Sequence, residues 1–173
     1  LKQKGITMEN ESIAEAEVLV NMPRDKVWQR LRDLTIAHYY VPGLKDCRMT
    51  TEQKEGVGAS RKVYTTSGMV MDETVVEWNE GSGFIIRLHN GDGPPPPIFT
   101  QARFHYRIED APNGQTLFRP AMTYTIKFGI LGRLLDKLLL NMIIRSTMKK
   151  VGLGLKQFYE TGKPSNPAYR PTA

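Results

Sequence analysis

Between residues 12 and 128 the chain alternates apolar and polar side chains in short runs that are separated by turn-forming residues. Alternation with a period of two predicts strands that bury one face. The predicted strands cover residues 12–20, 44–52, 58–65, 70–78, 83–90, 99–109 and 116–128. The separators, among them "KEGVG", "NEGSG" and "DAPNGQ", are short and rich in Gly, Pro and Asn. Such turns indicate strands that pair antiparallel with their neighbours along the chain. Pro120, inside the last strand, predicts a bulge.

Two short helices are expected after the first strand. The stretch "MPRDKVWQRLRDL" places Pro23 where a first helical turn tolerates it, and apolar residues recur at helical spacing behind it. The second short helix is expected at about residues 35–40. The last helix is much longer, from about 130 to 161, and ends at Gly162 with a proline just beyond.

This order predicts an α+β fold in which a curved antiparallel sheet of about seven strands wraps around the long C-terminal helix. One long helix fills a strongly curved sheet poorly, so we expect a cavity between them. A chain of 173 residues fits a single domain, expected at residues 12–162. Residues 1–11 are expected to be a flexible N-terminal segment, and residues 163–173 a disordered C-terminal tail.

The apolar residues of the long helix form two stripes. At about 100° per residue, a later stripe predicts the face that packs on the sheet. This later stripe contains Leu140, Ile144, Met148, Val151, Leu155 and Phe158. An earlier stripe is rotated from it by roughly 160°. This earlier stripe contains Leu131, Leu135, Leu138 and Met142. The earlier stripe needs a further partner: the pocket mouth, the short helices, a second subunit or a membrane surface. A kink near Asn141 that turns both stripes into one cavity is the alternative.

Composition and charge limit the classes of partner and the compartment that we expect. The net charge is +6 and the pI is 9.5, but the basic residues are scattered and are not interleaved with aromatic ones, so no nucleic-acid partner is expected. The single cysteine, Cys47, fits a buried structural thiol and a reducing compartment, and we expect a cytoplasmic protein. The longest uncharged apolar stretch of the last helix, residues 138–144, is far shorter than the ~20 residues of a membrane span.

Two charged residues fall on the inner face of the predicted sheet. Arg61 alternates with Val63, and Glu73 lies between Met71 and Val75. Buried charges must be paired or hydrogen-bonded. The pair is therefore either a polar anchor in an apolar pocket or a structural ion pair.

The period of two in the strands and the later stripe of the long helix together give a candidate ligand-binding set. It consists of Arg61, Met71, Glu73, Phe84, Ile86, Leu88, Phe99, Phe104, Tyr106, Phe118, Met122, Tyr124, Leu140, Ile144 and Met148, and the family resemblance described below adds Tyr39 and Tyr40. Arg87, His89, Arg103, His105 and Arg107 are expected on the outer face. The histidines show no metal-ligand spacing, and neither a metal nor a cofactor is expected. The stiff stretch "NGDGPPPPIF" predicts either a flap over the cavity or a hairpin connection that resists pairing.

Five motifs in order resemble the helix-grip fold of the START-like, Bet v 1-like (SRPBCC) superfamily, near its polyketide cyclase/dehydrase and lipid-transport branch. They are "MPRDKVWQRLRDL", "YYVPGLKDC", "GVGASRKV", "MDETVVEW" and "GILGRLLDKLL". In START-like aromatase/cyclases an Arg and pocket Tyr residues are thought to orient a polyketide carbonyl. The resemblance implies Arg61 with Tyr39, Tyr40 or Tyr64 as their equivalents.

Three functions remain open. The first is a carrier or sensor that binds a small hydrophobic molecule, such as a lipid, an isoprenoid or a polyketide, in the cavity. The second is a polyketide cyclase or dehydratase, with Arg61, Glu73 and Tyr64 as candidate catalytic residues and Glu73 as the base. The third is a protein- or membrane-surface module, or a homodimer, that makes contact through Leu131, Leu135 and Leu138.

Overall fold

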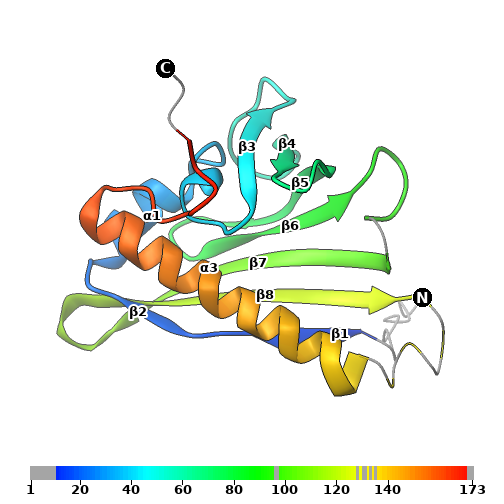
Figure 1. Ribbon diagram of the computed structural model, residues 1–173. Helices are drawn as coiled ribbons and strands as arrows, with labels where there is room; N and C mark the ends of the chain where they lie inside the picture. The colour runs from blue at the N-terminus through cyan, green and yellow to red at the C-terminus, as the bar shows by residue number, and fades with distance from the viewer. Residues whose placement is uncertain are drawn as a thin grey trace, which may run out of the picture.

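The computed structural model describes residues 11–95, 98–127, 129, 132, 134 and 136–170, without the side chains of residues 137 and 138. These residues form an eight-stranded antiparallel sheet in the order β1-β8-β7-β6-β5-β4-β3, with β2 also paired to β8 (Figure 1). The strands are β1 (Ser12–Glu15), β2 (Val18–Val20), β3 (Leu44–Met49), β4 (Ser60–Thr65), β5 (Val70–Asn79), β6 (Gly83–His89), β7 (Phe99–Ala111) and β8 (Gln115–Ile126). The predicted antiparallel meander is confirmed.

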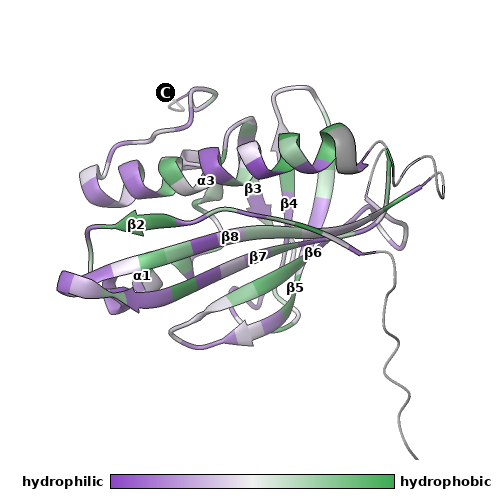
Figure 2. Ribbon diagram, turned by 90° about the horizontal axis from the view of Figure 1, so that it is seen from below, coloured by the Kyte–Doolittle hydropathy of each residue, from purple (hydrophilic) through white to green (hydrophobic). Residues whose placement is uncertain are grey.

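The helices lie against this sheet. They are α1 (Arg24–Leu31), the 3₁₀ turns η1 (Ala37–Tyr39) and η2 (Pro112–Gly114), the π-helical turn η3 (Asp136–Leu140) and α3 (Asn141–Thr161). α3 crosses the sheet along its length (Figure 1), and the view from below shows it as a separate layer on one face (Figure 2). The α+β arrangement expected from the sequence is therefore confirmed, with two short helical elements between the first strands and β3.

The predicted strand at residues 12–20 is divided into β1 and β2. The register runs on unchanged from Glu15 opposite Ala121 to Val18 opposite Phe118, so the bulge expected at Pro120 is wrong. Proline has no N–H to donate, and only the N–H of Ala16 bonds across, to the Pro120 carbonyl at 3.0 Å. The missing N–H of Pro120 therefore interrupts the neighbouring strand between β1 and β2 and causes no bulge in β8. The register shifts of the sheet lie in β3, β5 and β7.

The predicted core stripe of the long helix is buried from Ile144 to Leu155. It continues at Tyr159 and not at the predicted Phe158, which is only half-buried and packs against Tyr39 at 5.2 Å. α3 ends at Gly162, whose φ of 71° is left-handed, as the sequence predicts.

The π-helical turn η3 precedes α3. A π turn holds more residues than an α turn, so it changes the helical phase where the apolar face was expected to change sides. Asp136 of this turn is buried, whereas Leu134 and Leu139 are exposed. Leu131 and Leu135, and the side chain of Leu138, lie outside the described residues.

Residues 163–170 are not the disordered tail that we expected. The N–H groups of Ser165 and Asn166 donate to the Tyr39 carbonyl at 3.0 and 2.9 Å. The Asn166 side chain is buried, and its Nδ2 donates to the carbonyls of His38 and Leu44, both at 2.7 Å. These bonds attach the chain after α3 to η1 and to the start of β3.

Candidate functional site

Arg61 and Glu73 form an ion pair on the inner face of the sheet. They are register partners on β4 and β5, and the Nε and Nη2 of Arg61 both reach Oε2 of Glu73 at 2.6 Å. A third guanidinium nitrogen, Nη1, donates to the carbonyl of Leu34. The pair is almost fully buried, with Arg61 3% and Glu73 8% exposed. Burial disfavours the charged guanidinium, but the adjacent Glu73 carboxylate and smaller contributions from neighbouring groups together outweigh it, and the pKa of Arg61 is raised. The guanidinium is therefore charged, and its bonds to Glu73 and Leu34 fix it in place.

Two buried tyrosines, Tyr106 and Tyr40, lie near this pair, and a third, Tyr159, lies beside these two. Tyr106 comes from β7, Tyr159 from α3 and Tyr40 from the turn after η1. Burial raises the pKa of Tyr106 to about 12, against the opposing charge of Arg61. Burial likewise raises the pKa of Tyr40 and of Tyr159 well above the usual value. All three hydroxyls are therefore protonated at neutral pH and are able to donate hydrogen bonds.

The hydroxyl of Tyr159 is buried and makes no hydrogen bond of ordinary geometry among the described residues, although the Tyr40 side chain lies close enough to interact with it. Its ring lies 5.9 Å from that of Tyr40, edge to face. A buried hydroxyl without a partner costs about 1–3 kcal/mol, and native proteins rarely leave one unless water or a ligand supplies the bond. Tyr159 therefore marks a point of the interior where a polar atom would be stabilised.

Apolar side chains surround the polar cluster, and their exposure changes along the inner face. Phe118 and Leu155 are fully buried, whereas Leu88 and Met122 keep 8% and 9% of their surface exposed. Other inner-face side chains are only half-buried: Met71, Phe99, Phe104, Ile126 and Leu140. The interior is thus closed to solvent at Phe118 and Leu155 and more open toward the ends of β7 and β8 that lie near η3.

The site differs from the sequence prediction at three tyrosines. Tyr64 lies on the outer face of β4, under the guanidinium of Arg48 at 5.2 Å, so it is not a pocket residue. Tyr39 packs against Phe158 and Tyr169 at 5.2 and 5.0 Å, beside the C-terminal segment, and not in the interior. Tyr159 was missed, although it stands four residues after Leu155 on the core stripe.

The remaining predicted lining residues of the sheet lie on its inner face. Phe84, Ile86, Leu88, Tyr106, Phe118, Met122 and Tyr124 are buried, as are Ile144 and Met148 of α3. Arg87, Arg103 and Arg107 are exposed, and His89 and His105 half-buried, on the opposite face. His105 donates to or accepts from Thr123 at 3.0 Å, and burial lowers its pKa.

A second buried polar group holds the start of the helix. Oδ1 of Asp136 accepts a hydrogen bond from the Tyr124 hydroxyl at 2.6 Å, and Oδ2 accepts one from Ser12. Asn141 donates to the same Tyr124 hydroxyl at 3.1 Å and to the carbonyl of Ile13 at 2.8 Å. Burial, reinforced by the bond to Asp136, raises the pKa of Tyr124. This group joins η3 and α3 to β1 and β8.

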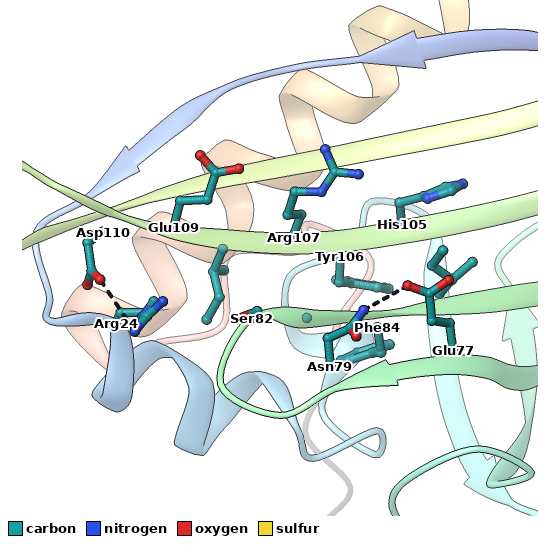
Figure 3. A pocket seen from close by; sticks show the side chains of 13 residues that line it. Arg24, Glu77, Asn79, Ser82, Phe84, His105, Tyr106, Arg107, Glu109 and Asp110 are labelled. Carbon is teal, nitrogen blue, oxygen red and sulfur yellow. Dashed lines mark hydrogen bonds and ion pairs between the residues drawn. The ribbon is translucent and has the colours of Figure 1, made fainter.

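The outer face of the sheet carries a pocket lined by charged side chains. It has a volume of about 400 Å³, lies at the start of β6 and is lined by His105, Arg107 and Glu109 of β7 (Figure 3). At its end Arg24 pairs with Asp110 at 3.4 Å. Among the described residues, no group of three or more His, Cys, Asp or Glu could hold a metal ion, and no helix is long and apolar enough to cross a membrane.

A sequence model for polyketide cyclase/dehydrase and lipid transport proteins matches residues 13–158. The chain belongs to this family. Members of the family bind hydrophobic ligands or act as polyketide cyclases. No curated protein matches the sequence.

Solved structures share the fold. Ara h 8.0201 is 15% identical with a TM-score of 0.65, covering 87% of this chain and 99% of that one. TTHA0849 from Thermus thermophilus is 17% identical with a TM-score of 0.65, at 87% and 99% coverage. The di-domain ARO/CYC StfQ from the steffimycin biosynthetic pathway is 17% identical with a TM-score of 0.69; the match covers 87% of this chain and 51% of StfQ. At these identities the likeness establishes the fold alone.

Proposed function

We propose that the protein binds a small hydrophobic molecule with a polar end, as a carrier or sensor, in the interior between the sheet and α3. The observation that carries the proposal is the Tyr159 hydroxyl, which is buried beside Tyr40 and makes no hydrogen bond of ordinary geometry among the described residues. A ligand oxygen at this point would accept the bond that the protein leaves unmade.

The charges near Tyr159 indicate the chemistry of that polar end. Glu73 neutralises Arg61 in the buried pair, and Arg30, whose guanidinium lies 5.7 Å from the centroid of the Tyr159 ring, is exposed to solvent. The buried polar groups therefore carry no net charge. A carboxylate ligand would bury an uncompensated charge, which is costly in an apolar interior. A ketone, ester or hydroxyl oxygen would need only a hydrogen bond from Tyr159 or its neighbours. The ligand is therefore a neutral molecule with an oxygen at one end of an apolar body.

The half-buried side chains Phe99, Phe104 and Ile126 support a route into this interior. They face inward from β7 and β8 yet stay accessible, while Tyr40 and Leu155 near Tyr159 are 3% and 0% exposed. A ligand that enters between these strand ends and η3 would cover apolar surface that the free protein leaves partly in water.

Thermal unfolding with three matched compounds tests the proposal. We expect 2-dodecanone to raise the melting temperature most, dodecane less, and dodecanoate least. Native mass spectrometry of the purified protein is expected to show a bound neutral compound. If none of the three compounds changes the melting temperature and the protein is purified empty, the proposal is wrong.

Tyr159→Phe isolates the hydroxyl. This change removes the unpartnered group and keeps the ring, so the free protein is expected to be as stable as the wild type or more stable, by up to about 1 kcal/mol. Binding of 2-dodecanone is expected to weaken by about fivefold, with dodecane unaffected. Tyr169→Phe, at the half-buried surface position, is the control and should change neither quantity.

A second candidate function is cyclisation or dehydration of a poly-β-ketone, and the place of Tyr106 favours it. Its phenol stays protonated beside the Arg61 charge, an arrangement able to stabilise a developing enolate oxygen. Glu73 is poorly placed as a free base, because its Oε2 already accepts two N–H bonds from Arg61. Tyr106→Phe is expected to lower turnover by about a hundredfold. Wild-type protein that forms no product from such substrates would exclude this function.

A further inference from the structure

We propose that the solvent face of α3, together with the exposed residues just before it, docks on the surface of an anionic phospholipid membrane. Large apolar side chains are concentrated here: Leu134 is 58% exposed, Leu139 47%, Met142 64%, Ile143 50% and Leu153 49%. Exposed apolar groups on one surface in this number indicate a partner.

The solvent face of α3 lies opposite its core stripe. Met142, Ser146, Lys150 and Leu153 follow the spacing of one helix side, away from the buried stripe that begins at Ile144. Figure 2 shows α3 as an outer layer, with the C-terminal segment beyond its last turns and no strand or helix there among the described residues. A groove of about 590 Å³ between α3 and the β1–β2 link continues this surface, with Met142 and Ala16 in its lining.

The charges of α3 favour an anionic partner. From Asn141 to Tyr159 the helix carries no Asp or Glu, and Arg145, Lys149 and Lys150 are exposed on it. Glu15 and Glu17 line the same groove, but Glu17 pairs with Arg119 at 3.2 Å. Basic residues beside exposed apolar ones are the pattern of a helix that lies in a membrane interface.

The same charges argue against a second copy of the chain. In a symmetric dimer each interface residue meets the partner's equivalent patch. Packing two α3 helices on this face would bring Lys149 and Lys150 against a second cluster of the same sign, which is unfavourable. An anionic lipid surface instead satisfies the basic side chains and covers Met142 and Ile143. Docking at this face needs no interior ligand.

Vesicle flotation tests the docking. We expect the protein to float with vesicles of phosphatidylcholine and phosphatidylserine, to float less with phosphatidylcholine alone, and to lose binding as salt rises. Arg145→Glu/Lys150→Glu should weaken binding to phosphatidylserine vesicles by more than about tenfold. Met142→Ser/Ile143→Ser should weaken binding to both vesicle types.

Matched controls lie on other faces. Arg87→Glu/Arg103→Glu makes the same charge change on the outer face of the sheet, and Val57→Ser/Val76→Ser removes exposed valines away from α3. Both controls should bind vesicles as the wild type does. The proposal is overturned if the wild type ignores phosphatidylserine vesicles at low salt, or if the controls lose as much binding as the α3 variants. A stable dimer that Met142→Ser/Ile143→Ser dissociates would also overturn it.

Discussion

Arg61 and Glu73 are the residues on which the interior depends most. Removing one partner of a buried pair leaves an uncompensated charge, so Glu73→Ala is expected to lower the free energy of unfolding by about 3–5 kcal/mol. Arg61→Met/Glu73→Leu removes both charges and is expected to cost less than the single change, despite the lost bond to Leu34. Urea unfolding of the two variants measures the difference. A double variant less stable than the single one would contradict this account of the pair.

Glu80 accepts hydrogen bonds from two tryptophans, and these bonds make the stability of the fold depend on pH. Its Oε1 accepts a hydrogen bond from the Trp28 indole at 2.8 Å and its Oε2 one from Trp78 at 3.0 Å. These two bonds lower the pKa of Glu80 in the folded state. Their contribution to stability is therefore complete above the ordinary carboxyl pKa and is lost as the pH falls through the lowered one.

We therefore expect Glu80→Gln to be less stable than the wild type at neutral pH and to lose less stability on acidification to about pH 4. Tryptophan fluorescence during urea unfolding at both pH values measures this, because both rings are reporters at the site. Glu52→Gln, at an exposed position, is the control. Equal acid sensitivity of wild type and Glu80→Gln would show that these bonds do not govern it.

The sequence predicts the inner face well at the residue scale, because a period of two fixes which side chains share a face. Arg61 and Glu73 follow from that rule alone. The same rule excludes Tyr64, since it is the neighbour of inward-facing Val63; the resemblance to cyclases suggested it against the pattern. Tyr159 follows Leu155 at helical spacing, but which residue of the helix stripe meets Tyr40 and Tyr106 depends on tertiary packing.

At the scale of elements, predictions failed where a neighbour far along the chain decides the outcome. The division of β1 from β2 is caused by Pro120, more than a hundred residues away. The order of residues 163–170 depends on backbone carbonyls at residues 38–44. The sequence pattern within either segment does not show the distant residues with which it forms hydrogen bonds. The strands themselves were predictable because alternation is a local property.

Asn166 tests how far the C-terminal segment stabilises this end of the molecule. Asn166→Ala leaves the buried carbonyls of His38 and Leu44 without their donor, and is expected to cost about 1–3 kcal/mol. Hydrogen exchange should increase mainly in η1 and the start of β3. Lys163→Ala, at an exposed position of the same segment, should change neither. Unchanged exchange in Asn166→Ala would show that the segment does not hold η1.

For the whole molecule, α3 is held at both ends by buried polar side chains. Asp136 and Tyr124 join its beginning to β1 and β8, and Asn166 joins the chain after it to η1. The accessible part of the interior lies near the Asp136 end, and the packed part with Tyr159 lies near the other. The Asp136 attachment therefore lies beside the part of the interior through which a ligand would enter, and the Asn166 attachment lies at the opposite end of α3.

Asp136→Asn and Asn166→Ala are expected to affect ligand exchange differently, if the interior binds ligand as proposed. Nile red is a suitable probe, because it is a neutral apolar dye with a carbonyl oxygen. Asp136→Asn weakens the attachment beside the accessible end, so it should speed both entry and release of the dye. The affinity should change little, because the polar cluster around Tyr159 is untouched. Asn166→Ala should lower stability but leave the exchange rates close to those of the wild type. Stopped-flow fluorescence measures both rates. Faster exchange in Asn166→Ala and unchanged exchange in Asp136→Asn would place the route at the opposite end of α3, near η1.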